Sequence, residues 1–179
     1  MKIPKTLCCA LFFLFFPLLE SMSPKMHFFD EDSQLIYQVN AEAGKMLKKR
    51  YHLEPMGTGC SAPDGLIIEL NLAVRCYADL DIEKGRALMV KAARTYLEVI
   101  NASKKLQPLL ATHPFGPKNI DLTIYVAYPG KHGVEIGKLT AISVIKGNIA
   151  YKIRETQYTN KRIHTEAFEE AEKIVQSAH

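Results

Sequence analysis

The chain has 179 residues, 47% of them hydrophobic and 23% charged, with a formal net charge of +4 at pH 7. These proportions are those of an ordinary globular protein with enough apolar material for one core rather than two. They exclude a largely disordered chain, and the net charge is too small to indicate a nucleic-acid partner.

The first residues are typical of an export signal. Lys2 and Lys5 precede an uncharged run rich in leucine and phenylalanine, residues 7–19, whereas a spanning helix needs about 18 or more apolar residues. We therefore expect a signal peptide over residues 1–21 and a single exported domain over residues 22–179, periplasmic or secreted. Contact with a membrane is expected only if the segment stays uncleaved.

The next segments predict a helix, a loop and a strand. Apolar residues recur at the helical period from Asp30 to Leu47, which predicts an amphipathic helix. Residues 54–65 are rich in glycine and proline and are predicted as a loop. Strict alternation then predicts a strand over residues 66–77 with one buried face. The residues predicted on that face are Leu66, Ile68, Leu70, Leu72, Val74 and Cys76.

A second helix and a second strand follow. Asp79 or Asp81 is placed to cap a helix that continues to Asn101, and the helical period puts Thr95 on its solvent side. Residues 120–128 alternate like the first strand and are predicted as another.

The C-terminal part predicts a hairpin and a last helix. Gly147-Asn148 supplies a two-residue turn, and counting outward from it pairs Val144 with Tyr151. Thr165 is predicted to cap a helix that begins with Glu166 and buries Ile174.

Together these elements predict an α+β fold, a two-layer sandwich with helices packed on one face of a roughly four-stranded, mainly antiparallel sheet. The other face of that sheet is predicted to be polar and open to solvent. Its candidate binding residues are Arg75, Tyr125, Lys152 and Arg154.

One segment invites a catalytic interpretation. Residues 57–61 read GTGCS, so Cys60 or Ser61 is a candidate nucleophile, with His113 or His132 as the base. The segment lacks the lysine of a phosphate loop and is not the G-x-S-x-G elbow, so a plain turn is the competing interpretation. No spacing of metal ligands is present, and we expect no metal and no cofactor.

Two cysteines follow the signal segment, Cys60 and Cys76. A straight strand over residues 66–76 spans about 33 Å, and the link from Cys60 to Leu66 reaches at most about 22 Å. The two Cα atoms would then stay about 11 Å apart or more, beyond the roughly 7 Å limit for a disulfide. We predict free thiols.

Several segments, MGTGCSAPDG, IEKGRALMV, LLATHPFGPKNI and GNIAY, are similar to those of small exported bacterial proteins for which no activity is described. The resemblance extends over about residues 54–155. It implies export and a single domain, and it implies no catalytic residue.

Three functions remain open from the sequence. The first is a non-enzymatic envelope or secreted module that binds a protein or another envelope component through the polar sheet face or its rim. The second is the hydrolase or transferase with Cys60 or Ser61 as nucleophile. The third is a carrier that holds a small ligand or lipid between the helices and the sheet.

Overall fold

The computed structural model describes residues 31–128 and 134–178; the predicted signal peptide, residues 1–21, lies outside these ranges. The described part has an α+β fold, as predicted. Its helices are α1 (Glu31–Tyr51), α2 (Ile82–Ala102) and α3 (Phe168–Ser177), with short 3₁₀ turns at Pro63–Gly65, Gln107–Leu109 and Pro117–Asn119. Its strands are β1 (Glu54–Ser61), β2 (Glu69–Cys76), β3 (Ile120–Val126), β4 (Leu139–Ile145), β5 (Asn148–Arg154) and β6 (Asn160–Ala167).

The strands form one six-stranded sheet in the order β1-β2-β3-β4-β5-β6, so the prediction of roughly four strands was wrong. β2 and β3 are parallel and joined through α2, and each other neighbouring pair is antiparallel. The sheet is therefore mixed. Two strands were missed, β1 and β6, and both lie at sheet edges.

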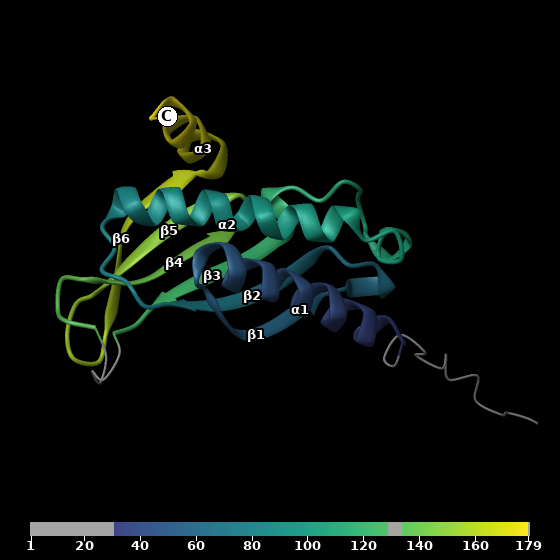
Figure 1. Ribbon diagram of the computed structural model, residues 1–179, viewed down its shortest axis with the longest axis horizontal. Coiled ribbons are helices and arrows are strands. Elements are labelled where there is room, and N and C mark those ends of the chain that lie inside the picture. The colour runs from purple at the N-terminus through teal and green to yellow at the C-terminus, as the bar shows by residue number, and fades with distance from the viewer. Residues whose placement is uncertain (1–30, 129–133, 179) are drawn as a thin grey trace, which may run out of the picture.

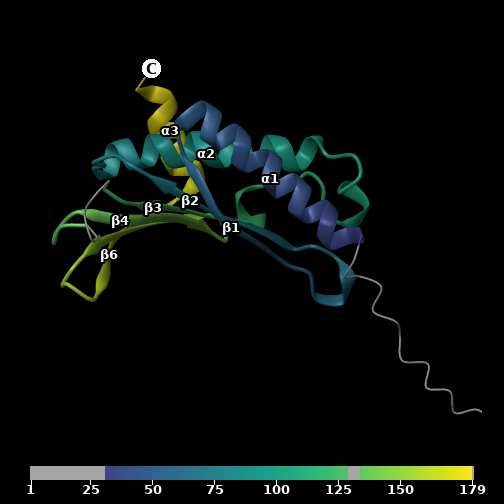
Figure 2. The ribbon, with the colours of Figure 1, turned by 60° about the horizontal axis from the view of Figure 1, so that its bottom comes forward.

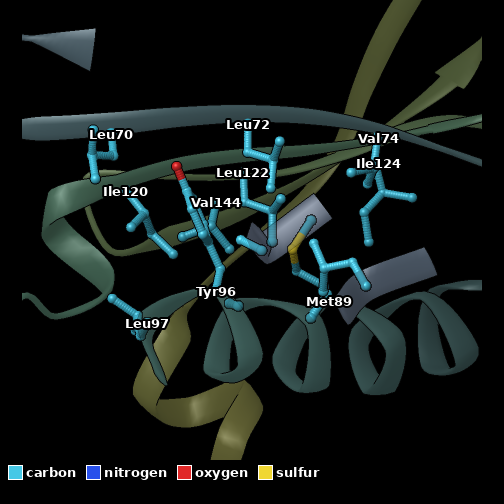
Figure 3. Packing of buried hydrophobic residues seen from close by; sticks show 14 of the residues in the cluster. Leu70, Leu72, Val74, Met89, Tyr96, Leu97, Ile120, Leu122, Ile124 and Val144 are labelled. Carbon is cyan, nitrogen blue, oxygen red and sulfur yellow. The ribbon is translucent and has the colours of Figure 1, made fainter. Parts of the chain in front are cut away.

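All three helices lie on one side of the sheet (Figure 1, Figure 2). Side chains from β2, β3 and β4 point toward α2, and Tyr96 points from α2 back toward the sheet (Figure 3). Leu70, Leu122 and Val144 are fully buried in this layer. No helix of the described residues lies over the second face of the sheet, which gives this part of the chain its two-layer arrangement. Within the described ranges, no helix is long and apolar enough to cross a membrane.

The central strand β2 is where the alternation placed it, with Leu70, Leu72, Val74 and Cys76 buried. Its first residues differ from the prediction. Leu66 and Ile68 are 47% and 43% exposed, whereas Ile67 is fully buried. Ile67 pairs with Leu110 in an isolated bridge outside the sheet, so the alternation that holds from Glu69 does not extend back to Leu66.

The segment predicted as a loop contains edge strand β1. Pro55 lies where the pairing of β1 with β2 is shifted by a bulge, and edges and bulges are where a sheet tolerates proline. On the helix side, α1 comes so close that a Cβ placed on Gly44 would lie 2.9 Å from Cγ of Pro55. Glycine at position 44 is therefore what lets α1 lie against β1.

The predicted hairpin exists, but its register is two residues off. Ile145 pairs with Asn148, and Val144 pairs with Ile149 rather than with Tyr151. The turn is centred on Lys146 and Gly147, which have φ angles of 50° and 77°, as a type I′ turn requires. A shift by two residues leaves every side chain on its predicted face.

The last helix also starts later than predicted. Thr165 and Glu166 belong to β6, Ala167 is the N-cap residue, and α3 begins at Phe168. Ile174 is 46% exposed rather than buried. The polar sequence of β6 has no alternating apolar set because, as an edge strand, it buries little.

Helix α2 is capped as expected, since the Asp81 side chain accepts a hydrogen bond of 2.7 Å from the backbone N–H of Lys84. Thr95, predicted in water, is 2% exposed. Its hydroxyl lies 3.2 Å from Nη1 of Arg50 and 3.2 Å from the hydroxyl of Tyr51. The end of α1 therefore covers this side of α2.

Candidate functional site

The uncovered side of the sheet, which we call the open face, is formed by the residues that alternate with the buried ones. Residues that are paired on neighbouring strands have their side chains on the same face, so the pairing register shows which residues form a row across that face. One row crosses all six strands and consists of small side chains or none: Gly57, Ala73, Thr123, Ser143, Ala150 and Thr165. The open face therefore has a low floor across its middle.

Ser143 lies in the middle of this floor and is only 4% exposed. Its neighbours in the row are Thr123 and Ala150. Within the described residues its hydroxyl makes no hydrogen bond. By contrast, the hydroxyl of Thr140, on the same strand, donates to the carbonyl of Lys152 at 3.2 Å. The floor thus contains a recessed polar group that is free to bond a ligand.

A shallow hollow of about 400 Å³ opens at the β1 end of the floor. Among the residues that line it are Gly57, Gly59, Ala73, Asp121 and Tyr125. The glycines create it, because β1 places no side chain over this part of β2. A Cβ added at Gly57 would have no atom within 4 Å, so the space above it is open.

One row along from the floor, toward the C-terminal ends of β2 and β3, the side chains are large and basic. Arg75 is paired with Tyr125, and Lys152 is paired with Arg162 of β6, with Ala141 between the two pairs. Tyr125 is 44% exposed. Arg154 occupies the next open-face position of β5, where it pairs with Asn160. We call Arg75, Lys152, Arg154 and Arg162 the basic rim.

The cations of the basic rim make no ion pair among the described residues, and Glu54 of β1, the cross-strand neighbour of Arg75, binds Lys48 instead. In the part of the chain that the structure describes, Arg75 bonds only the hydroxyl of Tyr77, at 3.3 Å. The arginines on the helix side behave differently, since each binds a glutamate. Those pairs are Arg50 with Glu98, Arg86 with Glu166 and Arg94 with Glu172.

The opposite end of the open face is acidic. Asp121 accepts from the hydroxyl of Thr123 at 3.4 Å, and Glu69 accepts from the amide of Asn71 at 3.4 Å. Because β2 and β3 are parallel and in register, their polar ends coincide, so acid collects at one end of the face and base at the other. The face therefore carries a charge gradient along the strands.

The predicted catalytic residues do not form a site in the described structure. Cys60 lies in β1, where it pairs with Leu70 of β2, and it is exposed. Ser61 is the last residue of β1. His113 is exposed in the connection before β3, and no hydrogen bond or ion pair links it to Cys60 or Ser61 among the described residues. His132 lies outside the described ranges. The arrangement thus gives neither candidate nucleophile a base.

Cys60 and Cys76 are both free thiols, as predicted. Burial raises the pKa of the Cys76 thiol above its usual value of 9.0, which makes it a poor nucleophile at neutral pH. Cys60 is the accessible thiol of the two.

A second cluster of titratable groups lies beneath the helices. Glu166 of β6 accepts hydrogen bonds from Arg86 of α2 and from the hydroxyl of Tyr151, and its side chain is 7% exposed. His164 lies 3.8 Å from the same carboxylate. Glu166, Arg86 and Tyr151 satisfy one another away from solvent, whereas the His164 side chain is 41% exposed. The cluster joins α2 to β6 rather than facing a ligand.

The described residues contain no group of three or more histidine, cysteine, aspartate or glutamate side chains that could hold a metal ion. Two residues of the open face were not anticipated from the sequence, Arg162 and Ser143. Arg162 was missed because β6 was missed. Ser143 follows the alternation of its strand onto the polar face, but nothing in a sequence shows that a side chain on that face is only 4% exposed.

No protein-family model, curated protein or solved structure matches this chain.

Proposed function

We propose that this protein is a non-enzymatic binding module of the cell envelope or the secreted fraction, and that the open face is its binding surface. The observation that carries the proposal is a basic rim whose cations make no ion pair among the described residues, beside a low floor on a sheet face that no described helix covers. Cations that make no ion pair, beside an exposed tyrosine, are the composition of a recognition surface. Export remains part of the proposal and rests on Lys2, Lys5 and residues 7–19.

The two other functions receive less support. A hydrolase or transferase needs a base in contact with its nucleophile, and the described part of the chain supplies none for Cys60 or Ser61. A lipid carrier needs space between the helices and the sheet. That space is filled by the protein's own side chains, among them Met89, Tyr96 and Leu122 (Figure 3).

Site-specific photo-crosslinking in the native host tests the proposal. A benzophenone amino acid at Gly57 places the probe over the hollow, where a new side chain meets no atom within 4 Å. The matched control carries it at Lys91, which is exposed on α2. We expect discrete adducts from position 57 and none from position 91. Equal labelling at both positions, or none at position 57, would contradict the proposal.

A further inference from the structure

We infer that the partner of the open face is an acidic polypeptide segment, lying across the strands with its carboxylates against the basic rim. This inference rests on the proposed binding function and names the chemistry of the partner. The carrying observation is charge complementarity. Arginine binds carboxylates through two parallel hydrogen bonds, and on the helix side of this protein every arginine already has a glutamate.

The direction of the segment follows from the register. Arg75 on β2 and Arg162 on β6 belong to one row, four strand spacings apart, which is about 19 Å at about 4.8 Å per strand. A segment running across the strands follows this row and stays clear of Asp121 and Glu69 at the acidic end. One running along the strands would have to meet both ends.

The size of the face is near the lower limit for a folded partner. Six strands about 4.8 Å apart, each seven or eight residues long at about 3.3 Å per residue, cover roughly 700 Å², and a stable interface takes about 800 Å² from each partner. A second copy of this chain would bring Asp121 and Glu69 of its own acidic end against the basic rim, so a dimer in solution that R75Q/K152Q/R154Q dissociates would overturn the inference. A flat anionic membrane fits poorly, since the sheet bends so that the open face lies on the inside of the curve (Figure 2).

Two features favour polypeptide over an anionic polysaccharide. Tyrosine and arginine are the residue types that dominate protein interfaces, and Tyr125 and Arg75 are neighbours here. The second feature is Ser143, whose recessed hydroxyl has no partner within the described residues and sits in a floor with small side chains. A backbone amide or carbonyl that lies on the floor can reach it.

Fluorescence anisotropy with the purified mature protein tests the inference. The probe is a labelled peptide of about ten residues in which glutamate alternates with alanine, and the comparison peptide has lysine in place of glutamate. We expect the acidic peptide to bind and the basic one not to bind. We also expect the affinity to fall steeply between low and high salt, because the rim cations are half-buried at Arg75, Lys152 and Arg154 and exposed at Arg162, where solvent ions reach them.

Matched charge variants locate the binding. The variant R75Q/K152Q/R154Q removes rim charges, and K45Q/K49Q/K91Q removes as many exposed cations from the helices. The first should weaken acidic-peptide binding about tenfold or more, as the loss of several charge-assisted bonds requires, and the second less than about twofold. Equal weakening by both triples would overturn the inference, because it would show attraction to net charge alone.

A variant that leaves every charge in place tests whether the segment contacts Ser143 on the floor. S143A should weaken the peptide about threefold, on the scale of one lost hydrogen bond, without changing the unfolding midpoint. No effect of S143A on binding would overturn the placement of the segment on the floor.

Competition separates the possible sources of negative charge. Polygalacturonate and vesicles containing phosphatidylglycerol are the competitors. If either binds more tightly than the acidic peptide, and loses binding in the rim variant, the assignment to a polypeptide is wrong. The proposed function can survive that result. Photo-adducts at position 57 together with an acidic peptide that fails to bind would remove the inference alone.

Discussion

The Nε atom of Arg86 on α2 lies 2.8 Å and 3.0 Å from the two carboxylate oxygens of Glu166 on β6. The hydroxyl of Tyr151 on β5 donates to the same carboxylate. These residues are far apart in the sequence, and together they connect the first turns of the central helix to the last strand of the sheet. Edge strand β6 is otherwise held by its pairing with β5 and by α3.

Glu166→Gln should destabilise the protein by about 3–5 kcal/mol, because breaking a buried ion pair leaves the other charge uncompensated. Chemical denaturation at pH 7 measures the change in the free energy of unfolding. Glu169→Gln is the control, since Glu169 is an exposed glutamate on α3 that makes no ion pair in the described structure, and it should change stability by less than about 0.5 kcal/mol. If the two variants behave alike, the cluster contributes little.

The same carboxylate sets a dependence on pH. Burial by itself would raise the pKa of Glu166, but the hydrogen bonds from Arg86 and Tyr151 and the charge of Arg86 lower it below the ordinary 4.5. Because the pKa of Glu166 is lower in the folded than in the unfolded state, the ionised carboxylate stabilises the protein at pH values above the unfolded-state pKa. This contribution is lost as the pH falls through the folded-state pKa.

We therefore expect the difference in unfolding free energy between the wild type and Glu166→Gln to persist from pH 7 to pH 5, where His164 beside the carboxylate can only add to it if it gains a proton. It should shrink below about pH 4.5. Measuring a difference is necessary because the pKa of Asp79, which accepts hydrogen bonds from Lys138 and Tyr128, is also lowered. A difference that stays unchanged down to pH 3 would mean that Glu166 is not the titrating group.

The sequence predicted the buried and open faces well and the number of strands poorly. Alternation is a local signal, so β2, β3 and the sidedness of the hairpin followed from it even though the hairpin register was wrong. Edge strands lack this signal. β1 has glycines at positions 57 and 59 where a central strand would carry side chains, and β6 is polar on both faces.

For the candidate site, the sequence likewise predicted the face on which a residue lies but not which residues lie side by side. Arg75, Tyr125 and Lys152 could be assigned to the polar face from period two alone. Their alignment in one row requires the parallel pairing of β2 with β3 and the antiparallel pairing of β4 with β5. Those pairings are set by the crossover through α2 and by the turn at Lys146 and Gly147, and neither could be deduced from alternation.

Gly44→Ala tests the contact between α1 and β1. Alanine is normally better than glycine in a helix by about 1 kcal/mol, yet here its Cβ would lie 2.9 Å from Cγ of Pro55. A proline ring cannot rotate away, so we expect a loss of about 1–3 kcal/mol from overpacking. Thermal unfolding measures it.

The compensating variant Pro55→Ala removes the Cγ atom. We expect Gly44→Ala combined with Pro55→Ala to be at least as stable as Pro55→Ala alone, which is the coupling that a direct contact produces. Additive effects of the two substitutions would show that the close approach is relieved elsewhere.

Thiol labelling distinguishes the two cysteines and bears on the catalytic alternative. Cys60 is exposed and Cys76 is 6% exposed, and burial raises the pKa of Cys76. With Ellman's reagent we expect the folded protein to react at Cys60 only, and Cys76 to react after denaturation. Cys60→Ser should remove the fast phase. An activated nucleophile needs a cationic or basic neighbour, and no hydrogen bond or ion pair in the described structure gives Cys60 one, so labelling at pH 7 should be no faster than that of a cysteine in a short unstructured peptide. Labelling much faster than in that peptide would instead indicate such a neighbour and would favour the hydrolase or transferase over the binding module.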